Sequence, residues 1–189
     1  MKRPKKVAHR LTEHTKLIQK AVLVSGEKAL LLKRSADSKT RPECWDLPGG
    51  NAEWPEITDN QAGLHAQELV REIEEETGIA VDAQVFARST PILFDTYFEA
   101  DKQVYAVITN WLVELPDSFP EDQLVLSDEH TEYAWTSLEE LKNFDFGGER
   151  GNFIVESVET ALAFAQAAAG KAGGCCGGAC GGVGGGCHH

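Results

Sequence analysis

The segment Arg71-Glu72-Ile73-Glu74-Glu75-Glu76-Thr77-Gly78 is the most informative stretch of this 189-residue chain. It ends a run of apolar residues that recur at the spacing of one helix face: Ala62, Ala66, Leu69, Val70 and Ile73. This spacing predicts an amphipathic helix. Thr58 can cap its start with Gln61 as the capping partner, and Gly78 can end it. The sequence therefore predicts one helix over residues 58–77.

The acidic residues of this helix gather on one side. At about 100° per residue, Glu72, Glu75 and Glu76 share a face with Glu68, whereas Glu74 points to the far side. Like-charged pairs on a helix cost roughly 0.2–0.5 kcal/mol each, and acidic groups at a helix C-terminus oppose its dipole. A bound hard cation such as Mg²⁺ or Mn²⁺ would offset this repulsion. The alternative is a solvated charged face, and the spacing alone leaves both interpretations open.

With Gly50 and Glu56 added, the segment resembles the signature of the Nudix hydrolases. That signature is a glycine, five residues, a glutamate, seven residues and then Arg-Glu-apolar-x-Glu-Glu-x-Gly-apolar. Residues 71–79 match every specified position, and Gly50 and Glu56 have the family spacing. The preceding Trp45-Asp46-Leu47-Pro48-Gly49 is similar to the usual lead-in. The wider resemblance covers residues 20–168, including the segment 135–141.

The chain departs from the family pattern between Glu56 and Arg71. Fourteen residues separate them where the family has seven, Pro55 stands where glycine is common, and Glu68 replaces a small residue. Seven extra residues are close to two helical turns, so we expect the insertion to be helical and the catalytic half to keep its facing. The departure leaves the role of Glu56 open.

The resemblance implies an α/β fold, a Nudix-type α/β/α sandwich around a mixed β-sheet. It also implies a Mg²⁺- or Mn²⁺-dependent hydrolysis in which water attacks a phosphorus of a nucleoside diphosphate linked to another moiety. Glu75 and Glu76 would be the principal metal ligands, and Glu72 a ligand or the base that activates water. Arg71 would orient a carboxylate, and the Gly50 carbonyl would add a metal contact.

Other residues complete the candidate site. Gly49, Glu56 and Gly78 are the structural positions of the motif, and Glu68 is a possible additional acidic group. Glu129 is the candidate catalytic carboxylate from outside the helix, because similar Glu-His-x-x-Tyr-x-Trp segments occur in several Nudix subgroups. A plain polar loop is the alternative there. We expect His130 at the surface and Cys44 as a small core residue. Candidates for stacking on a base are Trp45, Phe94, Tyr97 and Trp111.

The remaining pattern alternates strand and helix signals. Two apolar runs around Ser25-Gly26-Glu27 predict a β-hairpin. Residues 103–114 are expected to form a strand buried on both faces. The other predicted elements are a short strand at 44–47, strands at 79–87, 92–98 and 132–136, a helix at 138–143, and a last helix from Asn152 to about Ala169.

Charge and composition divide the chain into three parts: a basic N-terminal arm (1–19), a Nudix hydrolase domain (20–169) and a Gly/Cys-rich flexible tail (170–189). Residues 1–20 carry +6 of a total charge of −12, so the rest is strongly acidic, which argues against a nucleic-acid partner. The chain shows neither an apolar run of ~20 residues nor a secretory signal, and its body has one cysteine. We expect no membrane partner and a cytoplasmic location.

Three functions fit these features. The first is a pyrophosphohydrolase acting on a small nucleotide. The second is a non-catalytic, regulatory nucleotide-binding Nudix module. The third is an RNA 5′-end pyrophosphohydrolase that uses the basic arm as a phosphate anchor. The intact carboxylate set favours the first. The sequence does not name the nucleotide and leaves a homodimer possible. The four Cys and two His of the tail match no zinc-site spacing that we know, which favours a disordered appendage over a zinc site.

Overall fold

The computed structural model describes residues 14–53, 62–116, 119–120, 122 and 124–172. The predicted hairpin is formed by strands β1 (Thr15–Ser25) and β2 (Lys28–Arg34), with Gly26 in the turn. Four further strands complete the sheet: β3 (Trp45–Asp46), β4 (Leu93–Glu99), β5 (Val104–Glu114) and β6 (His130–Thr136). Their order is β3-β2-β1-β5-β4, and β6 pairs with β2. Because β1 runs parallel to β5 and the other pairs are antiparallel, the sheet is mixed, as expected.

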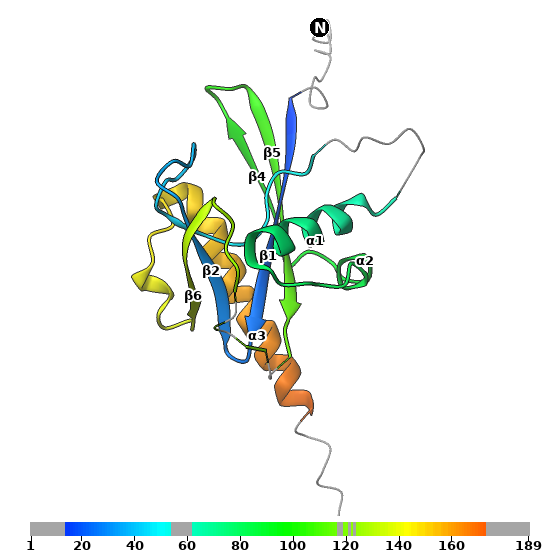
Figure 1. Ribbon diagram of the computed structural model, residues 1–189. Helices are drawn as coiled ribbons and strands as arrows, with labels where there is room; N and C mark the ends of the chain where they lie inside the picture. Colours follow the sequence, from blue (N-terminus) through cyan, green and yellow to red (C-terminus); the bar gives the residue numbers. More distant parts are fainter. Residues whose placement is uncertain (1–13, 54–61, 117–118, 121, 123, 173–189) are drawn as a thin grey trace, which may run out of the picture.

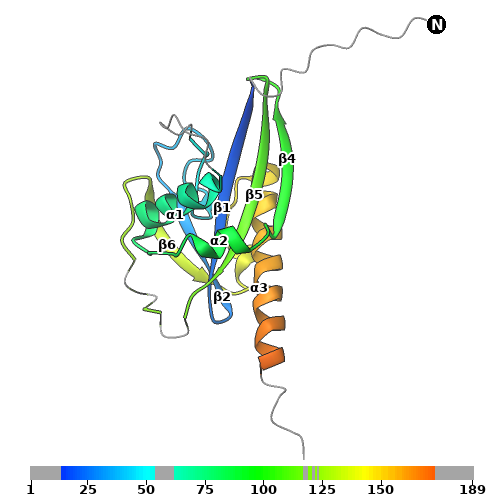
Figure 2. The ribbon, with the colours of Figure 1, turned by 90° about the vertical axis from the view of Figure 1, so that its right-hand side faces the viewer.

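Helices cover both faces of this sheet (Figures 1 and 2). Helices α1 (Leu64–Thr77) and α2 (Gln84–Arg88) lie on one face, and α3 (Asn152–Ala172) lies on the other. Successive side chains of β1 point to opposite faces of the sheet, so that Leu23 packs in the core beneath α1 and Val22 in the core beneath α3. This confirms the predicted α/β/α sandwich.

The first strand begins inside the segment that the sequence assigned to the N-terminal arm. Residues 15–19 belong to β1 and pair in parallel with residues 105–109 of β5. Of the arm, residues 1–13 lie outside the described residues. Strand β5 has neighbours on both sides, β1 and β4, so its predicted interior position is confirmed.

The start of the acidic helix differs from the prediction. Helix α1 begins at Leu64, and neither Ala62 nor Gly63 is helical. Gly63 has φ +74°, the left-handed conformation, which cannot continue a right-handed helix. The expected cap residues Thr58 and Gln61 lie outside the described residues. The predicted unbroken helix from residue 58 is therefore wrong, and the break at Gly63 separates α1 from most of the insertion.

Two other predicted elements are also different. Residues 79–87 do not form a strand: the Asp82 carboxylate accepts a hydrogen bond from the Gln84 N–H at 2.9 Å and helps to start α2. Residues 138–143 form a turn and a 3₁₀ helix, η1 (Leu141–Asn143), rather than an α-helix. The strand prediction relied on a short apolar pattern, which does not separate strand from helix, and the helix prediction relied on Ser137 as a cap.

The last helix begins at Asn152, as predicted, after a second 3₁₀ helix, η2 (Gly148–Gly151), and it continues to Ala172. Its apolar stripe includes Ile154, Val158 and Leu162, all buried. Over the described ranges, no helix combines the length and apolarity that a membrane crossing requires.

Candidate active site

Helix α1 carries the acidic residues and ends at a glycine. Gly78 has φ +73° and donates its N–H to the Glu74 carbonyl at 2.8 Å, which closes the last turn. Leu69 and Ile73 are buried against the sheet. The helix therefore has a fixed rotation, and its C-terminal glutamates lie at the edge of the core.

Arg71 joins three of the four glutamates of the acidic face. Its Nη2 donates to Glu68 Oε2 at 3.0 Å and to Glu72 Oε1 at 2.7 Å, and its Nη1 donates to Glu75 Oε2 at 2.8 Å. These contacts raise the pKa of Arg71, with Glu68 as the largest cause. Arg71, a residue of the helix itself, thus offsets part of the repulsion between these glutamates.

Glu76 is the most buried acid of this helix, with 7% of its surface exposed. Its Oε2 accepts the Gly49 N–H at 2.6 Å, and burial raises its pKa to about 7. Burial also raises the pKa of Glu72. A buried carboxylate beside a half-buried one makes this end of α1 a place where positive charge is stabilised.

The two glycines of the turn before the helix allow close approach. Gly49 has φ +115°, and a Cβ atom there would lie 2.3 Å from the Gln19 carbonyl oxygen. At Gly50 a Cβ would lie 2.8 Å from Glu72 Oε2. The Gly50 carbonyl, the expected metal contact, accepts the Gln19 N–H at 2.9 Å. Any larger residue at either position would push the turn away from the sheet or from the acids.

A cleft of about 630 Å³ is bordered by five of the ten predicted site residues. Its wall includes Glu72 and Glu76 of α1, Gly49 and Gly50, and Glu129 from the loop before β6. Glu68 and Glu75 are bonded to Arg71 and do not border this cleft, and 59% of the Glu75 side chain is exposed. Glu56 lies outside the described residues. The structure therefore brings Glu72, Glu76 and Glu129 to one cleft.

His130 is not the surface residue that the sequence suggested. Only 6% of its surface is exposed, and its Nε2 lies 4.0 Å from Glu76 Oε1. Burial, together with the positive charge of Lys20, lowers its pKa to about 4, so the imidazole is neutral at pH 7 and this contact is not an ion pair. The burial of β6 does not alternate along the strand, so no period in the sequence marked His130 as buried.

The four aromatic candidates have different positions. Tyr97 borders the cleft. Trp45 packs edge-to-face on Phe144, Trp111 is buried and stacked on His65, and Phe94 is 68% exposed. Cys44 is a buried free thiol, as expected of a small core residue.

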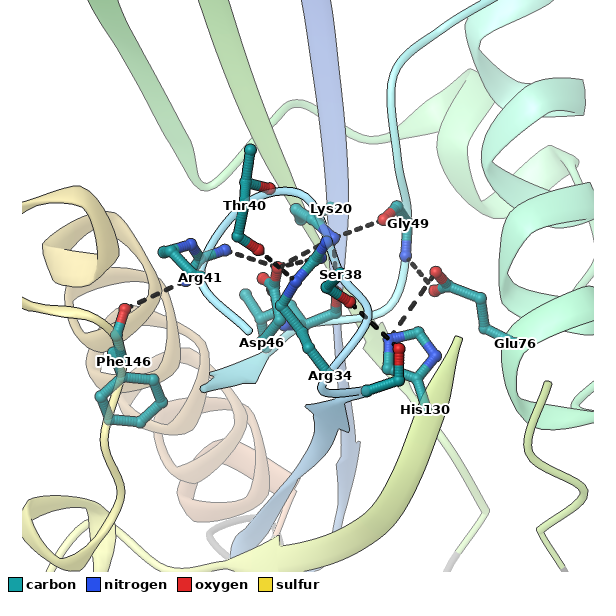
Figure 3. A network of polar contacts seen from close by, with 12 residues as sticks. Lys20, Arg34, Ser38, Thr40, Arg41, Asp46, Gly49, Glu76, His130 and Phe146 are labelled. Atoms are coloured by element: carbon teal, nitrogen blue, oxygen red, sulfur yellow. Dashed lines mark hydrogen bonds and ion pairs between the residues drawn. The ribbon is translucent and has the colours of Figure 1, made fainter. Parts of the chain in front are cut away.

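A network around Asp46 was missed by the sequence analysis (Figure 3). Its side chain is 1% exposed, and its Oδ2 lies 2.5 Å from Arg41 Nη2, 3.2 Å from Arg34 Nη1 and 3.5 Å from Lys20 Nζ. Although burial opposes its ionisation, Lys20, Arg41 and Arg34 hold its pKa below the usual 3.8. The signal in the sequence was a charged residue enclosed by Trp45 and Leu47 in a short strand.

The acids suit a hard divalent cation by their chemistry. The groups at this end of α1 are carboxylates and backbone carbonyls, the oxygen ligands that Mg²⁺ and Mn²⁺ prefer. Within the described part of the chain, no group of three or more His, Cys, Asp or Glu side chains is already spaced to hold a metal ion. Arg71 bonds one oxygen of Glu72 and one of Glu75, so each carboxylate keeps a second oxygen that could bind a cation, although Glu75 does not border the cleft while Arg71 holds it.

Similar folds are found among solved structures. A MutT protein from Methanosarcina mazei Go1 is 25% identical, with a TM-score of 0.53 over 77% of this chain and 91% of that one. A NUDIX hydrolase from Nitrosomonas europaea is 19% identical, with a TM-score of 0.57 over 79% and 90%.

A third similar structure is a bifunctional NMN adenylyltransferase/ADP ribose pyrophosphatase from Francisella tularensis, in complex with AMP and a manganese ion. It is 20% identical, with a TM-score of 0.50 over 76% of this chain and 42% of that one.

Comparison with sequences gives one clear result. No curated protein matches the chain. The sequence model of the NUDIX domain, in contrast, matches residues 18–156, which contain the acidic helix, both glycines of the turn and Glu129. This span is well over half of the chain and runs from β1 to the first residues of α3, with every residue of the cleft wall except Lys16. The chain therefore belongs to the NUDIX family and is a Nudix hydrolase.

Proposed function

We propose that this hydrolase is a divalent-cation-dependent pyrophosphohydrolase that cleaves a small nucleotide, a nucleoside diphosphate linked to another moiety. The observation that carries the proposal is the meeting of Glu72, Glu76 and Glu129 at one cleft, with the Gly49–Gly50 turn against the first two. A cleft of about 630 Å³ is of the size that holds a small-molecule ligand.

The reaction forms a bond between a water oxygen and phosphorus and breaks the bond from that phosphorus to the bridging oxygen, which leaves with the other phosphate. A bound Mg²⁺ or Mn²⁺ would neutralise charge on the phosphate oxygens and lower the pKa of a bound water molecule. Such a reaction needs charge neutralisation and an oriented nucleophile more than covalent help.

Each residue of the site has a role in this proposal. Glu76, oriented by the Gly49 N–H, and Glu72 hold the cation, and Glu75 joins them when Arg71 releases it. Glu129, on another segment of the cleft wall, accepts the proton of the attacking water. Arg71 positions the carboxylates before the cation binds, because it already contacts Glu68, Glu72 and Glu75.

Charge-neutral substitutions on α1 test these roles. Glu75→Gln and Glu76→Gln should each lower kcat by about 10²-fold or more, because each removes a carboxylate charge where phosphate charge is neutralised. Glu74→Gln is the matched control: Glu74 is exposed, points away from the acidic face, and should leave kcat nearly unchanged. An equal loss in all three variants would contradict the assigned face of the helix.

A further inference from the structure

More positive charge converges on Asp46 than Asp46 can neutralise. Lys20, Arg34 and Arg41 all approach the same oxygen, Asp46 Oδ2, so three cations share one carboxylate. Arg34 and Arg41 each use only part of their five N–H groups in hydrogen bonds to other described residues. The cluster therefore keeps a net positive charge and further donors beside the cleft, whose wall includes both arginines.

Both guanidinium groups are fixed before any ligand arrives. Arg34 Nε donates to the Thr40 carbonyl at 3.0 Å, and Arg41 Nη1 donates to the Phe146 carbonyl at 3.1 Å. The Arg41 guanidinium also lies over the Phe153 ring, 5.8 Å from its centroid. Held in this way, the two side chains lose little further freedom on binding an anion.

The backbone of the loop is strained where it presents Arg41. Arg41 has φ +47° and Glu43 has φ +59°, a conformation that residues other than glycine seldom adopt. Strain of this kind persists only where the surrounding contacts enforce it, and it concentrates at binding and catalytic sites. Arg41 is thus held at the cleft against the local preference of its backbone.

The arginine cluster is continuous with the acidic end of α1 (Figure 3). Glu76 Oε2 accepts the Gly49 N–H at 2.6 Å, and the Gly49 carbonyl accepts a hydrogen bond from the Lys20 ammonium. Lys20 also lies 3.5 Å from Asp46 Oδ2. One cleft therefore carries acids suited to cations at one place and paired guanidinium groups at another, joined through Lys20.

We propose that Arg34 and Arg41 form a subsite for a phosphate group of the substrate other than the one attacked by water. This inference rests on the proposed function and narrows its substrate class. The preferred substrate is a nucleotide whose phosphate chain ends in a free phosphate, such as a nucleoside triphosphate, rather than one whose diphosphate ends in a neutral sugar. Paired guanidinium groups suit phosphate because each can donate two parallel hydrogen bonds to its oxygens.

The other charged residues of the cleft wall include acids as well as cations. Asp95, Glu149 and Glu156 border the cleft and would repel a phosphate placed beside them. Glu99, also in the wall, is already paired with Lys16 and Lys102, so those two lysines are engaged. Lys39 and Arg150 also border the cleft, but among the residues described Arg34 and Arg41 are the guanidinium groups of its wall that both Asp46 and a backbone carbonyl hold in place.

Binding of inorganic pyrophosphate in EDTA, measured by calorimetry, tests the subsite without metal or turnover. Arg34→Gln and Arg41→Gln should each weaken binding about tenfold or more, the usual effect of losing charge-assisted hydrogen bonds. Lys33→Gln is the matched control, because Lys33 is the neighbour of Arg34 on β2, pairs with Glu132 at 2.6 Å and does not border the cleft. It should stay within about twofold of the wild type.

Two further variants separate a binding role from a structural one. Arg41→Lys keeps the positive charge near Asp46 but loses the paired N–H donors of the guanidinium group. It should therefore fold like the wild type and bind pyrophosphate more tightly than Arg41→Gln but more weakly than the wild type. Circular dichroism checks the fold of each variant. Unchanged pyrophosphate affinity in folded Arg34→Gln and Arg41→Gln, or an equal loss in Lys33→Gln, would overturn the subsite.

Kinetics with two substrates test the specificity. Arg41→Gln should lower kcat/KM for ATP at least about tenfold more than for ADP-ribose, mainly through KM. An equal loss for both would overturn the assignment. If the chain hydrolyses no compound of a nucleotide panel that includes these two, while pyrophosphate binding still depends on both arginines, the proposed hydrolysis fails and the phosphate subsite stands. If hydrolysis proceeds and pyrophosphate binding is independent of the arginines, only the subsite fails.

Discussion

At the scale of single residues, Asp46 is the carboxylate that pairs with three cations at the wall of the cleft. It is almost fully buried, it accepts the Leu47 N–H at 2.8 Å, and it draws Lys20, Arg34 and Arg41 together. A buried charge of this kind stabilises the fold only while its partners remain charged and close. Its removal would leave three neighbouring cations without their shared carboxylate.

Asp46→Asn should therefore destabilise the protein by about 3–5 kcal/mol at pH 7, the usual cost of removing one partner of a buried charge cluster. The folded pKa of Asp46 lies below its unfolded value of 3.8, so its contribution is complete above pH 3.8 and is lost as the pH falls through the folded pKa. Urea unfolding of both proteins at pH 7 and pH 3 measures this difference, which should shrink at pH 3.

A compensating variant gives the control. Arg34→Gln added to Asp46→Asn removes one of the uncompensated cations and should restore part of the stability at pH 7. Asp46 would stabilise the fold by packing rather than by charge if two results were found together. The wild type and Asp46→Asn would differ in free energy of unfolding by the same amount at pH 7 and pH 3, and the double variant would be no more stable than Asp46→Asn.

The acidic residues of α1 that the sequence identified share one property, a spacing along a single helix. Glu72 and Glu76 follow from the period of α1, which places them at the cleft, whereas Lys20 and Arg41 come from separate segments that meet only in the folded chain. No local period relates Lys20, Asp46 and Arg41, so sequence alone could not bring them together. The burial of His130 was missed for a similar reason, because it depends on how β6 pairs with β2.

At the scale of elements, long periodic segments were predictable and boundaries and short pieces were not. The strands β4 and β5 and the C-terminus of α1 agree with the sequence, because a clear period or a terminal glycine marks each of them. The strand predicted over residues 79–87 was wrong because a few apolar residues fit a strand and a helix equally well. In the structure Phe86 is buried from the short helix α2. The predicted start of α1 was wrong because Gly63 interrupts the apparent apolar stripe.

The break at Gly63 changes the expectation for the insertion. If the insertion extended α1, deleting four of its residues would turn the preceding segment to a different face, whereas deleting seven would not. Because α1 begins only after Gly63, its facing should not depend on the number of residues before it. Deletion of residues 57–60 and deletion of residues 57–63 should both keep kcat within about threefold of the wild type.

Steady-state turnover of the two deletion variants makes the comparison, and circular dichroism checks that both fold. Loss of activity on removing four residues but not seven would favour a helical insertion in phase with α1. Loss in both would mean that the inserted segment itself takes part in substrate binding.

At the scale of the whole molecule, the cleft is bordered by strands of the sheet and by helices from both of its faces. The turn at Gly49–Gly50 runs beside β1, α1 reaches it from one face, and the start of α3 borders the cleft from the other (Figure 2). The described structure ends within α3 at Ala172, and the segment with four cysteines and two histidines follows it. Among the described residues, both apolar cores and the cleft wall are formed by residues up to Ala165.

Truncation after Ala172 should therefore leave the melting temperature and the turnover number essentially unchanged. The reason is that no residue of the cleft or of either apolar core lies beyond this point among those described. Both quantities are measured for the full chain and the truncated chain, with and without a zinc chelator. A chelator-sensitive fall in melting temperature of the full chain alone would show that the C-terminal segment binds metal and stabilises the domain.

The central claim is that water attacks phosphorus in a cation-dependent reaction at the acidic end of α1. Its most direct test is chromatography and mass spectrometry of the products from a nucleotide panel, incubated with the full chain and Mg²⁺ in ¹⁸O-labelled water. We expect at least one nucleotide to be cleaved at its phosphoanhydride, with one ¹⁸O atom in one phosphate product, and no cleavage in EDTA or with Glu76→Gln. Cleavage that persists in EDTA or in Glu76→Gln, or label found outside the phosphate products, would contradict the account.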